Sequence, residues 1–451
     1  MRKSNLSYFL LSDLCTSCGV CAGICPTDCI SMVETVDGFH ALINQSQCLT
    51  KCDICFNICP PLNRWYTETQ VNEYNKIRYG PICGPYINLY TGWSNDPAIR
   101  RRGASGGLAT HIVKFLFKNE EIDSAILVRG KKDAPLYLES YLALDVNDIY
   151  QGAKSKYQLV PFDKSLQEAR IKKVKRLAIV GLPCHIQAVH RIQKYGGFLK
   201  NRVAIKIAIF CGHNVTKGFL RFFIEKEGLH EKDIINVTYR QGNWYNFDMV
   251  TFKTKDKIIR LPFRTSYLNA VWKGYLFSQK ACAFCPDLVG ESADISLGDA
   301  WLPKFSGNKE GLSLCLTKSK KGQKTIDKLI KDGELILFRR PIEDLFIAQS
   351  AQFLFKKEKR CYREKISKFV FMPCPNIGDF SRIVNFYPKS SSSGIKRFLK
   401  TVIRNRLLSK VGALYYFISI YLFAKSQRLR IAHRIPTMLL KLHARIIGIM
   451  H

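Results

Sequence analysis

The sequence predicts an α/β protein with α+β elements, in which a cysteine-rich N-terminal domain precedes the main domain and a basic helical tail follows it. Three observations carry this prediction. Cysteines concentrate before residue 65, apolar strand-like runs alternate with helical patterns from 86 to 380, and Lys and Arg gather after 395 without any Asp or Glu. Alternating strands and helices are typical of a sheet covered by helices. Because 451 residues exceed what one hydrophobic core normally serves, we expect domains at 1–65, 86–380 and 395–451.

Two cysteine runs dominate the N-terminal domain. They are Cys15-x2-Cys18-x2-Cys21-x3-Cys25-Pro26 and Cys48-x3-Cys52-x2-Cys55-x3-Cys59-Pro60. This paired spacing is the signature of a bacterial ferredoxin with two 4Fe-4S clusters, with one extra residue in the second run. Since the fourth cysteine of each run binds the other cluster, the predicted ligands are Cys15, Cys18, Cys21 and Cys59 for cluster 1, and Cys48, Cys52, Cys55 and Cys25 for cluster 2. A pair of structural zinc sites is the alternative, but zinc usually takes two separated cysteine pairs.

Other cysteines fit no ligand pattern and are predicted to be small buried side chains: Cys29, Cys83, Cys315, Cys361 and Cys374.

The apolar stretch near Met1 is ended too early by Asp13 to be a signal peptide, which predicts a cytoplasmic protein. Because disulfides persist only in oxidising compartments, we expect the cysteines to be thiolates.

The main domain is expected to alternate strands and helices. Apolar runs predict strands at Ala125–Val128, Leu177–Val180 and Val203–Phe210. Apolar residues at three- and four-residue spacing predict helices at Leu108–Asn119, Ser165–Val174, Ile186–Tyr195 and Lys217–Glu227. Alternating residues at Val237–Tyr239 and Asp248–Phe252 predict antiparallel strands beyond the α/β core.

Four further cysteines lie at positions typical of a ligand site. Cys184 and Cys211 end or follow strand-like runs, and α/β proteins bind ligands at the carboxyl ends of strands. Cys282-x2-Cys285 is a close pair beside a proline. Spacing alone leaves a third cluster open, because a lone C-x2-C with two distant cysteines is weak evidence.

Several short motifs follow one another in a specific order. They are Ala104-Ser105-Gly106-Gly107, Gly152-Ala153-Lys154-Ser155-Lys156-Tyr157, Gly181-Leu182-Pro183-Cys184-His185-Ile186-Gln187, Phe210-Cys211-Gly212-His213, Cys282-x2-Cys285 and Ala293-Asp294-Ile295-Ser296-Leu297-Gly298-Asp299-Ala300-Trp301. With these motifs the chain resembles, over residues 10 to 380, the beta-subunit family of coenzyme F420 hydrogenases and dehydrogenases.

The resemblance implies an α/β flavin-binding domain with a 4Fe-4S cluster close to its FAD. The cysteines that match this third cluster are Cys184, Cys211, Cys282 and Cys285. The residues expected to contact FAD are Ser105, Gly106, Gly107, Lys154, Ser155, Lys156 and Tyr157. Small residues that open a helix let backbone N–H groups approach a diphosphate, and the alternative is an ordinary glycine turn with a solvated loop. No catalytic residue is assigned, and His185 and His213 either tune a cluster, pass a proton or are structural.

Together these features predict an iron-sulfur flavoprotein oxidoreductase. Ferredoxin-type clusters would exchange single electrons with FAD, and FAD would exchange hydride with an organic substrate or a deazaflavin or flavin carrier, with coenzyme F420 as one candidate. An electron-relay subunit of a larger complex is the alternative, and the expected partner is ferredoxin or another oxidoreductase subunit. The net charge of +34 also fits a nucleic-acid-binding or zinc-stabilised interaction protein. No nucleic acid is expected, because no reading module or stacking platform accompanies the charge.

The tail at 395–451 has a separate pattern, in which basic segments flank the apolar stretch Val411–Ala424. This stretch is shorter than the roughly 20 residues that span a bilayer as a helix. Basic amphipathic helices bind anionic membrane surfaces, which predicts peripheral contact with the inner face of the membrane. Docking to an acidic partner and a solvated helix hairpin are the alternatives.

Overall fold

The computed structural model describes residues 14–35, 38–49, 51–62, 70, 72–73, 76–77, 79–242, 244, 246–264, 267–358, 360 and 363. The tail predicted at 395–451 lies outside this part of the chain, as do Cys361 and Cys374. Among the described helices, none combines the length and the apolar character needed to cross a membrane.

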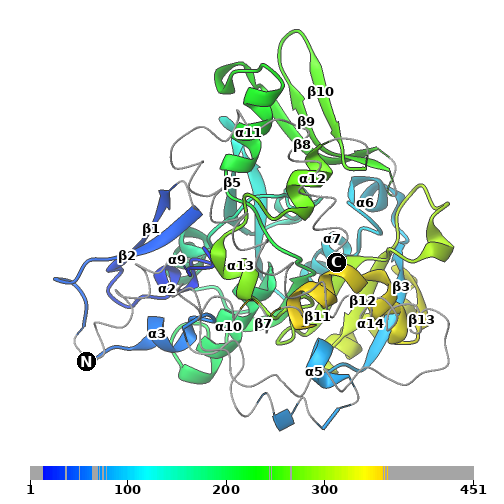
Figure 1. Ribbon diagram of the computed structural model, residues 1–451. Coiled ribbons are helices and arrows are strands. Elements are labelled where there is room, and N and C mark those ends of the chain that lie inside the picture. The colour runs from blue at the N-terminus through cyan, green and yellow to red at the C-terminus, as the bar shows by residue number, and fades with distance from the viewer. Residues whose placement is uncertain are drawn as a thin grey trace.

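The cysteine-rich segment forms a small unit at one side of the molecule (Figure 1). Its elements are α2 (Val20–Gly23), β1 (Ile30–Thr35), β2 (Gly38–Ile43) and α3 (Ile54–Ile58). The two strands pair antiparallel, with Ile30 opposite Ile43 and Thr35 opposite Gly38. Each short helix carries a cysteine of one run, Cys21 in α2 and Cys55 in α3. We call this segment the ferredoxin-like unit.

A mixed sheet forms the centre of the main domain, and within the described residues it has eight strands in the order β13-β3-β12-β11-β7-β6-β4-β5. The strands are β3 (Asn88–Ser94), β4 (Ser124–Lys131), β5 (Ala134–Ala143), β6 (Leu177–Gly181), β7 (Val203–Ile209), β11 (Ile295–Asp299), β12 (Ser313–Thr317) and β13 (Leu335–Arg340). Neighbours from β4 through β6 and β7 to β11 are parallel. The flanking pairs are antiparallel. The predicted α/β class with α+β elements is therefore confirmed.

Helices cover both faces of this sheet. They include α7 (Leu108–Lys118), α9 (Asp163–Ile171), α10 (Pro183–Tyr195) and α14 (Lys320–Lys331). Successive residues of β6 point to opposite faces, so that Leu177 and Ile179 pack with α9 and α10 while Ala178 packs with α7 and α14. The helices predicted from spacing in these regions are confirmed, with ends a few residues from their expected positions.

The antiparallel addition is also confirmed. β8 (Asn236–Gly242), β9 (Phe247–Lys253) and β10 (Ile258–Pro262) form a separate sheet. Phe219 and Phe223 of α11 (Gly218–Lys226) share a buried core with Val250 and Phe252 of this sheet. α11 is the fourth helix predicted from spacing.

Shorter elements complete the described fold: α5 (Gly80–Cys83), α6 (Pro97–Arg102), α8 (Val146–Gln151), η1 (Glu231–Asp233), α12 (Leu268–Lys273), α13 (Lys280–Phe284), η2 (Pro303–Phe305), α15 (Glu343–Ala348), α16 (Ser350–Phe353) and η3 (Leu354–Glu358).

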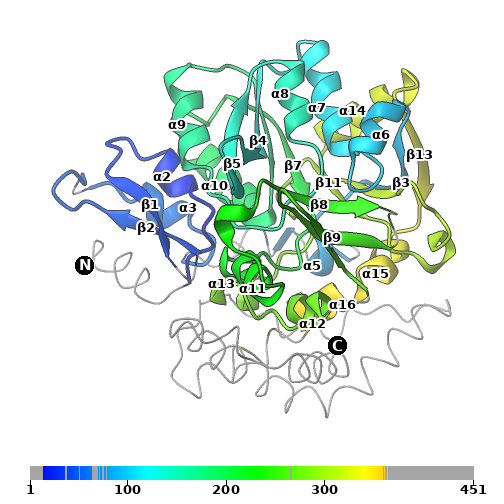
Figure 2. The same ribbon diagram turned by 90° about the horizontal axis from the view of Figure 1, so that it is seen from above.

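The ferredoxin-like unit packs directly against α9 and α10 of the main domain (Figure 2). Val20 and Ile58 are buried in the same core as Leu166 and Ile186. Gly23 makes the approach of α2 possible, because a Cβ atom there would lie 2.6 Å from the Cβ atom of Leu166. The unit is thus part of a continuous core with the main domain.

Candidate functional site

The first thiol set consists of Cys15, Cys18, Cys21 and Cys59. Burial, followed by the neighbouring thiols of Cys18, Cys15 and Cys59, raises the pKa of Cys21 well above its usual value. Burial, followed by Cys18 and Cys15, also raises the pKa of Cys59. The last cysteine of the second run therefore lies with the first three of the first run, as crossed ligation requires.

The second thiol set consists of Cys25, Cys48, Cys52 and Cys55, which line one cavity in the ferredoxin-like unit. Burial, followed by Cys52, raises the pKa of Cys55 to about 12. Cys29 is buried as predicted, but it also lines this cavity, and its sulfur lies 3.4 Å from that of Cys25. The spacing of Cys29 along the chain does not predict this position.

The third thiol set is formed at the carboxyl edge of the central sheet. Cys184 is the second residue of α10, directly after β6, and Cys211 follows the parallel neighbour β7. Cys282 lies in α13 and Cys285 caps it. All four line one cavity. The main sheet and α13 thus bring together the four cysteines that spacing alone could not connect.

The chemistry of the third set suits a metal cluster. Burial raises the pKa of Cys211 to about 12 and also raises that of Cys282. Buried thiols of this kind remain protonated unless a metal displaces their protons, which is how thiolate ligands couple to metal binding. Burial also raises the pKa of Cys184 well above its usual value, although this residue lies in the first turn of α10. Four thiols around one cavity are the donor set of a 4Fe-4S cluster.

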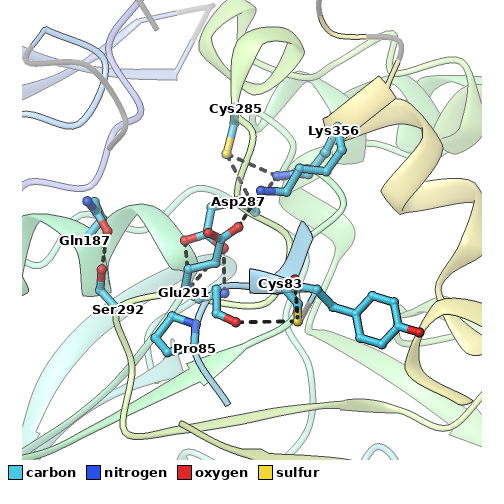
Figure 3. A network of polar contacts seen from close by, with 12 residues as sticks. Cys83, Pro85, Gln187, Cys285, Asp287, Glu291, Ser292 and Lys356 are labelled. Atoms are coloured by element: carbon cyan, nitrogen blue, oxygen red, sulfur yellow. Dashed lines mark hydrogen bonds and ion pairs between the residues drawn. The ribbon is translucent and has the colours of Figure 1, made fainter. Parts of the chain in front are cut away.

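One lysine belongs to the third set and was missed by the sequence analysis. The Nζ atom of Lys356 donates to the Sγ atom of Cys285 at 3.2 Å and to the carbonyl oxygen of Asp287 at 2.8 Å (Figure 3). Burial opposes its charge, yet the neighbouring cysteines, Cys285 first, hold the pKa of Lys356 above its usual value. Its position in the charged run Lys356-Lys357-Glu358 is typical of a solvated surface, so no sequence pattern indicates its burial.

The three thiol sets follow one another in space across the interface between the ferredoxin-like unit and the main domain. Apart from burial, the largest cause that raises the pKa of Cys184 is Cys18 of the first set. Thr16 and Ser17, which lie between two cysteines of the first set, line the cavity of the third. At the other end, Cys21 of the first set lines the cavity of the second. The first set therefore lies between the other two.

Polar contacts hold this arrangement. The backbone N–H of Phe162 donates to the carbonyl oxygen of Cys18 at 2.9 Å. Arg170 donates to the carbonyl oxygen of Cys25 at 2.8 Å and to the carboxylate of Asp28 at 2.6 and 2.7 Å. Because these contacts come from loops and helices of both parts, they fix the ferredoxin-like unit relative to α9.

The two segments predicted to contact FAD meet at Arg240 of β8. Arg240 donates to the carbonyl oxygen of Ala104 at 2.7 Å and to the carboxylate of Asp299 at 2.9 and 3.2 Å. Tyr157 lies beside the same guanidinium. Arg240 was not predicted, because an arginine in an alternating strand carries no distinguishing pattern.

The predicted FAD residues differ in how their polar groups are used. The N–H of Gly106 and the hydroxyl of Ser105 bond to the Ser313 hydroxyl at 2.9 and 2.7 Å, so these two groups are already satisfied by the protein. Gly107 opens α7 with a φ of 75°, which favours glycine. Part of the small-residue pattern at this helix start therefore serves the fold.

Lys154 and Lys156 leave a positive charge without a counter-ion. Neither forms an ion pair with a described carboxylate; Lys154 donates to Gln241 at 3.2 Å, and Lys156 to backbone carbonyl oxygens, including that of Gly152 at 2.9 Å. Burial, followed by Lys154, lowers the pKa of Lys156 to about 7. Two half-buried ammonium groups in this state suit an anionic ligand group.

The two histidines beside the third set differ. The ring of His185 accepts from the N–H of Leu182 and lies 3.1 Å from the carbonyl oxygen of Val160, which fits a structural role. Within the described residues, the buried ring nitrogens of His213 have no hydrogen-bond partner. Burial, followed by Lys356, lowers the pKa of His213 to about 3, so its ring is neutral.

Comparison with known proteins agrees with an α/β redox protein that carries a ferredoxin-like unit. The family model for the N-terminal part of the coenzyme F420 hydrogenase/dehydrogenase beta subunit matches residues 89–167, and the model for its C-terminal part matches 174–340. A "4Fe-4S binding domain" model matches residues 9–31. Since the first two models together span more than half of the chain, this protein belongs to the coenzyme F420 hydrogenase/dehydrogenase beta-subunit family, an oxidoreductase family.

Individual relatives are distant. The coenzyme F420-dependent sulfite reductase of Methanocaldococcus jannaschii is 24% identical over 92% of this chain, which spans 59% of that protein. The coenzyme F420 hydrogenase subunit beta of Methanothermobacter thermautotrophicus is 25% identical over 65% of this chain and 99% of that subunit. A chain of the F420-reducing [NiFe] hydrogenase complex from Methanosarcina barkeri shares the fold, with a TM-score of 0.50 at 23% identity over 63% of this chain and 95% of that one.

Proposed function

We propose that this protein is an iron-sulfur flavoprotein oxidoreductase that moves electrons between three 4Fe-4S clusters and an FAD. The FAD would exchange hydride with an organic substrate or with a deazaflavin or flavin carrier. The observation that carries the proposal is the linear order of the thiol sets. Thr16 and Ser17 of the first run line the cavity of the third set, and Cys21 of the first set lines the cavity of the second.

Each thiol set supports one cluster. A 4Fe-4S cluster usually binds four cysteine thiolates. The crossed assignment gives Cys59 to the first cluster and Cys25 to the second, in agreement with the neighbours of each thiol. The third cluster would bind Cys184, Cys211, Cys282 and Cys285.

The position of FAD is supported by charge. Lys154 and Lys156 would bind its diphosphate, since their half-buried ammonium groups have no described carboxylate partner. Arg240 would keep their segment beside the start of α7 through its bonds to Ala104 and Asp299. When bound, FAD takes or gives hydride as an electron pair and passes the electrons on singly.

The chain's own contacts would then determine the route. Electrons would enter or leave through the second cluster, pass the first and reach the third, because the first set lies between the other two. Thr16 and Ser17 would fill the space between the first and third clusters. Ser17 is held there by contacts with Gln279 and with the carbonyl oxygen of Phe39 at 2.6 Å.

The relay is tested by Gly23→Ala, which disturbs the packing of the ferredoxin-like unit. Alanine is a better helix residue than glycine, but its methyl group would meet the Cβ atom of Leu166 at 2.6 Å and the carbonyl oxygen of Asp163 at 2.9 Å. Such overpacking costs about 1–3 kcal/mol and would shift α2 away from α9. We expect slower flavin reduction after rapid mixing with a reduced bacterial ferredoxin, which is too large to reach a buried flavin directly.

The matched control is Gly130→Ala in β4, where an added Cβ atom meets nothing within 4 Å. Its flavin should be reduced at the wild-type rate, and both variants should keep their full iron content. Equal rates in all three proteins would contradict the relay, and a wild-type flavin that ferredoxin cannot reduce would contradict the proposed function.

An electron-relay subunit of a larger complex is the second candidate. It is favoured by the match to hydrogenase subunit beta, whose length is covered almost completely by 65% of this chain. The ferredoxin-like unit would then pass electrons to a partner subunit. Turnover by the isolated chain between reduced ferredoxin and coenzyme F420 would favour the stand-alone enzyme, whereas turnover only within an isolated complex would favour the relay role.

A further inference from the structure

We propose that the buried ammonium group of Lys356 raises the reduction potential of the third cluster and thereby draws electrons from the ferredoxin-like unit toward the flavin. This inference rests on the proposed function, since it requires a 4Fe-4S cluster on the third thiol set. It assigns a tuning role to a residue outside every motif of the family resemblance.

The position of Lys356 supports this role directly. Its side chain is 1% exposed and lines the same cavity as the four thiols. Its Nζ atom lies 3.2 Å from the Sγ atom of Cys285, within the range of a hydrogen bond to sulfur. A second bond at 2.8 Å to the carbonyl oxygen of Asp287 fixes the ammonium group against the loop that follows this ligand.

The charge of Lys356 has no carboxylate partner among the described residues. The next residue differs, because Lys357 forms a buried ion pair with Glu291 at 2.6 Å. Burying a single charge is costly unless an opposite charge accompanies it. The thiolates of Cys285 and its set supply that opposite charge only when they are deprotonated, which is their state in a cluster. The unpaired lysine and the thiol set therefore complement each other.

The surrounding segment keeps Lys356 in place. Residues Phe353 through Lys357 are all buried, which leaves the lysine no route to solvent. They belong to α16 and the π-helical turn η3, and π-turns occur frequently at functional sites. Arg363 donates to the carbonyl oxygens of Phe355 and Ala283 at 2.6 and 2.7 Å, which ties this turn to α13.

The physical effect has a defined sign. Reduction adds one electron to the cluster, and no bond or proton need change. A fixed positive charge in a poorly solvated site stabilises the more negative, reduced state. Hydrogen bonds to cluster sulfurs act in the same direction and are an established means of setting the potential. Arginines also lie beside the other two sets, where Arg191 and Arg170 donate to the carbonyl oxygens of Cys59 and Cys25. Because Lys356 is bonded to a ligand sulfur itself, the third cluster should be the preferred electron acceptor.

The test is a potentiometric titration of the whole anaerobic protein, followed by the electron paramagnetic resonance signal of the third cluster. Lys356→Gln and Lys356→Met remove the charge, and Lys356→Arg keeps it. We expect the two neutral variants to lower the equilibrium constant for reduction by about tenfold, a shift of about 59 mV for one electron, and the arginine variant to stay near wild type.

The matched control is the double variant Lys357→Gln with Glu291→Gln, which replaces a neutral buried ion pair in the same segment. Its third cluster should keep the wild-type potential even if the protein becomes less stable. If the neutral variants lose the third cluster while Lys356→Arg retains it, the result supports the requirement of the thiolate-bound cluster for a positive charge at this position.

Three results would overturn the inference. They are an unchanged reduction potential in the two neutral variants, a shift of the potential in Lys356→Arg as large as in the neutral variants, or loss of the third cluster in all three variants. If wild-type protein has the first two clusters but no third, the proposed three-cluster function fails as well. If the third cluster is present and its potential is unchanged in the neutral variants, only the role of Lys356 is refuted.

Discussion

Replacing Cys184 with alanine is expected to remove about four of about twelve iron atoms and to stop electron transfer between ferredoxin and the flavin. Cys18 of the first thiol set is, after burial, the largest cause of the raised pKa of Cys184. Loss of Cys184 would therefore break the relay at the interface between the first and third sets. The first and second clusters should keep their signals, because their ligands come from the ferredoxin-like unit. Iron analysis and rapid mixing with reduced ferredoxin measure the two effects.

Cys315→Ala is the matched control for this variant. Cys315 is fully buried in the core between the sheet and α7, and it lines none of the thiol cavities described above. Its replacement should cost about 1 kcal/mol of stability, as core substitutions commonly do, and leave iron content unchanged. A Cys184→Ala protein with full iron and an intact rate of flavin reduction would refute the assignment of this ligand.

Replacing Lys154 and Lys156 with glutamine is expected to weaken FAD binding by at least about 100-fold. This factor follows from a loss of about 1.5 kcal/mol for each of the two charge-assisted contacts. The two ammonium groups lack described carboxylate partners, and burial already lowers the pKa of Lys156 to about 7. Replacement of Lys156 also removes its bonds to the carbonyl oxygens of Gly152, Ala153 and Lys154, so the iron content serves as the check that the fold is retained. The flavin content after gel filtration and the iron content of the same sample report these effects.

The control exchanges Lys131 and Lys132 for glutamine, which removes the same charge from an exposed turn of the main domain. That protein should retain its flavin. Full flavin in the Lys154 and Lys156 variant, or an equal loss in both variants, would show that this pair does not hold the cofactor.

The cysteine spacing predicted much of the site. Four thiolates around a cubane require short, fixed separations along the chain, and this restriction makes the runs beginning at Cys15 and Cys48 recognisable without a structure. Helices α7 and α10 were equally predictable from the sequence, since each buries one apolar stripe against the sheet. These features depend on residues close together in sequence.

Features that depend on distant residues were not predictable. The order of β13, β3 and β12 at one edge of the sheet is set by packing between segments more than 200 residues apart. The docking of the ferredoxin-like unit depends on Gly23 fitting against Leu166, which has no local signature. The convergence of Cys211 with Cys282 required both the parallel register of β7 and the position of α13.

Charged residues gave misleading local signals. Lys356 and Lys357 belong to a polar run that ordinarily predicts a solvent-exposed turn, yet both are buried, one against a thiol and the other against Glu291. Arg240 lies in a strand where alternation predicts only which face it occupies. The partners that stabilise these charges come from other parts of the chain, so their burial is evident only in three dimensions.

The most direct test of the proposed three-cluster flavoprotein is the content of iron, acid-labile sulfide, zinc and flavin in wild-type protein purified without oxygen. Three clusters with four ligands each predict about twelve irons, a matching amount of sulfide and one FAD per chain. About eight irons with FAD would contradict the cluster assigned to Cys184, Cys211, Cys282 and Cys285. Zinc without iron or flavin would contradict the redox account as a whole.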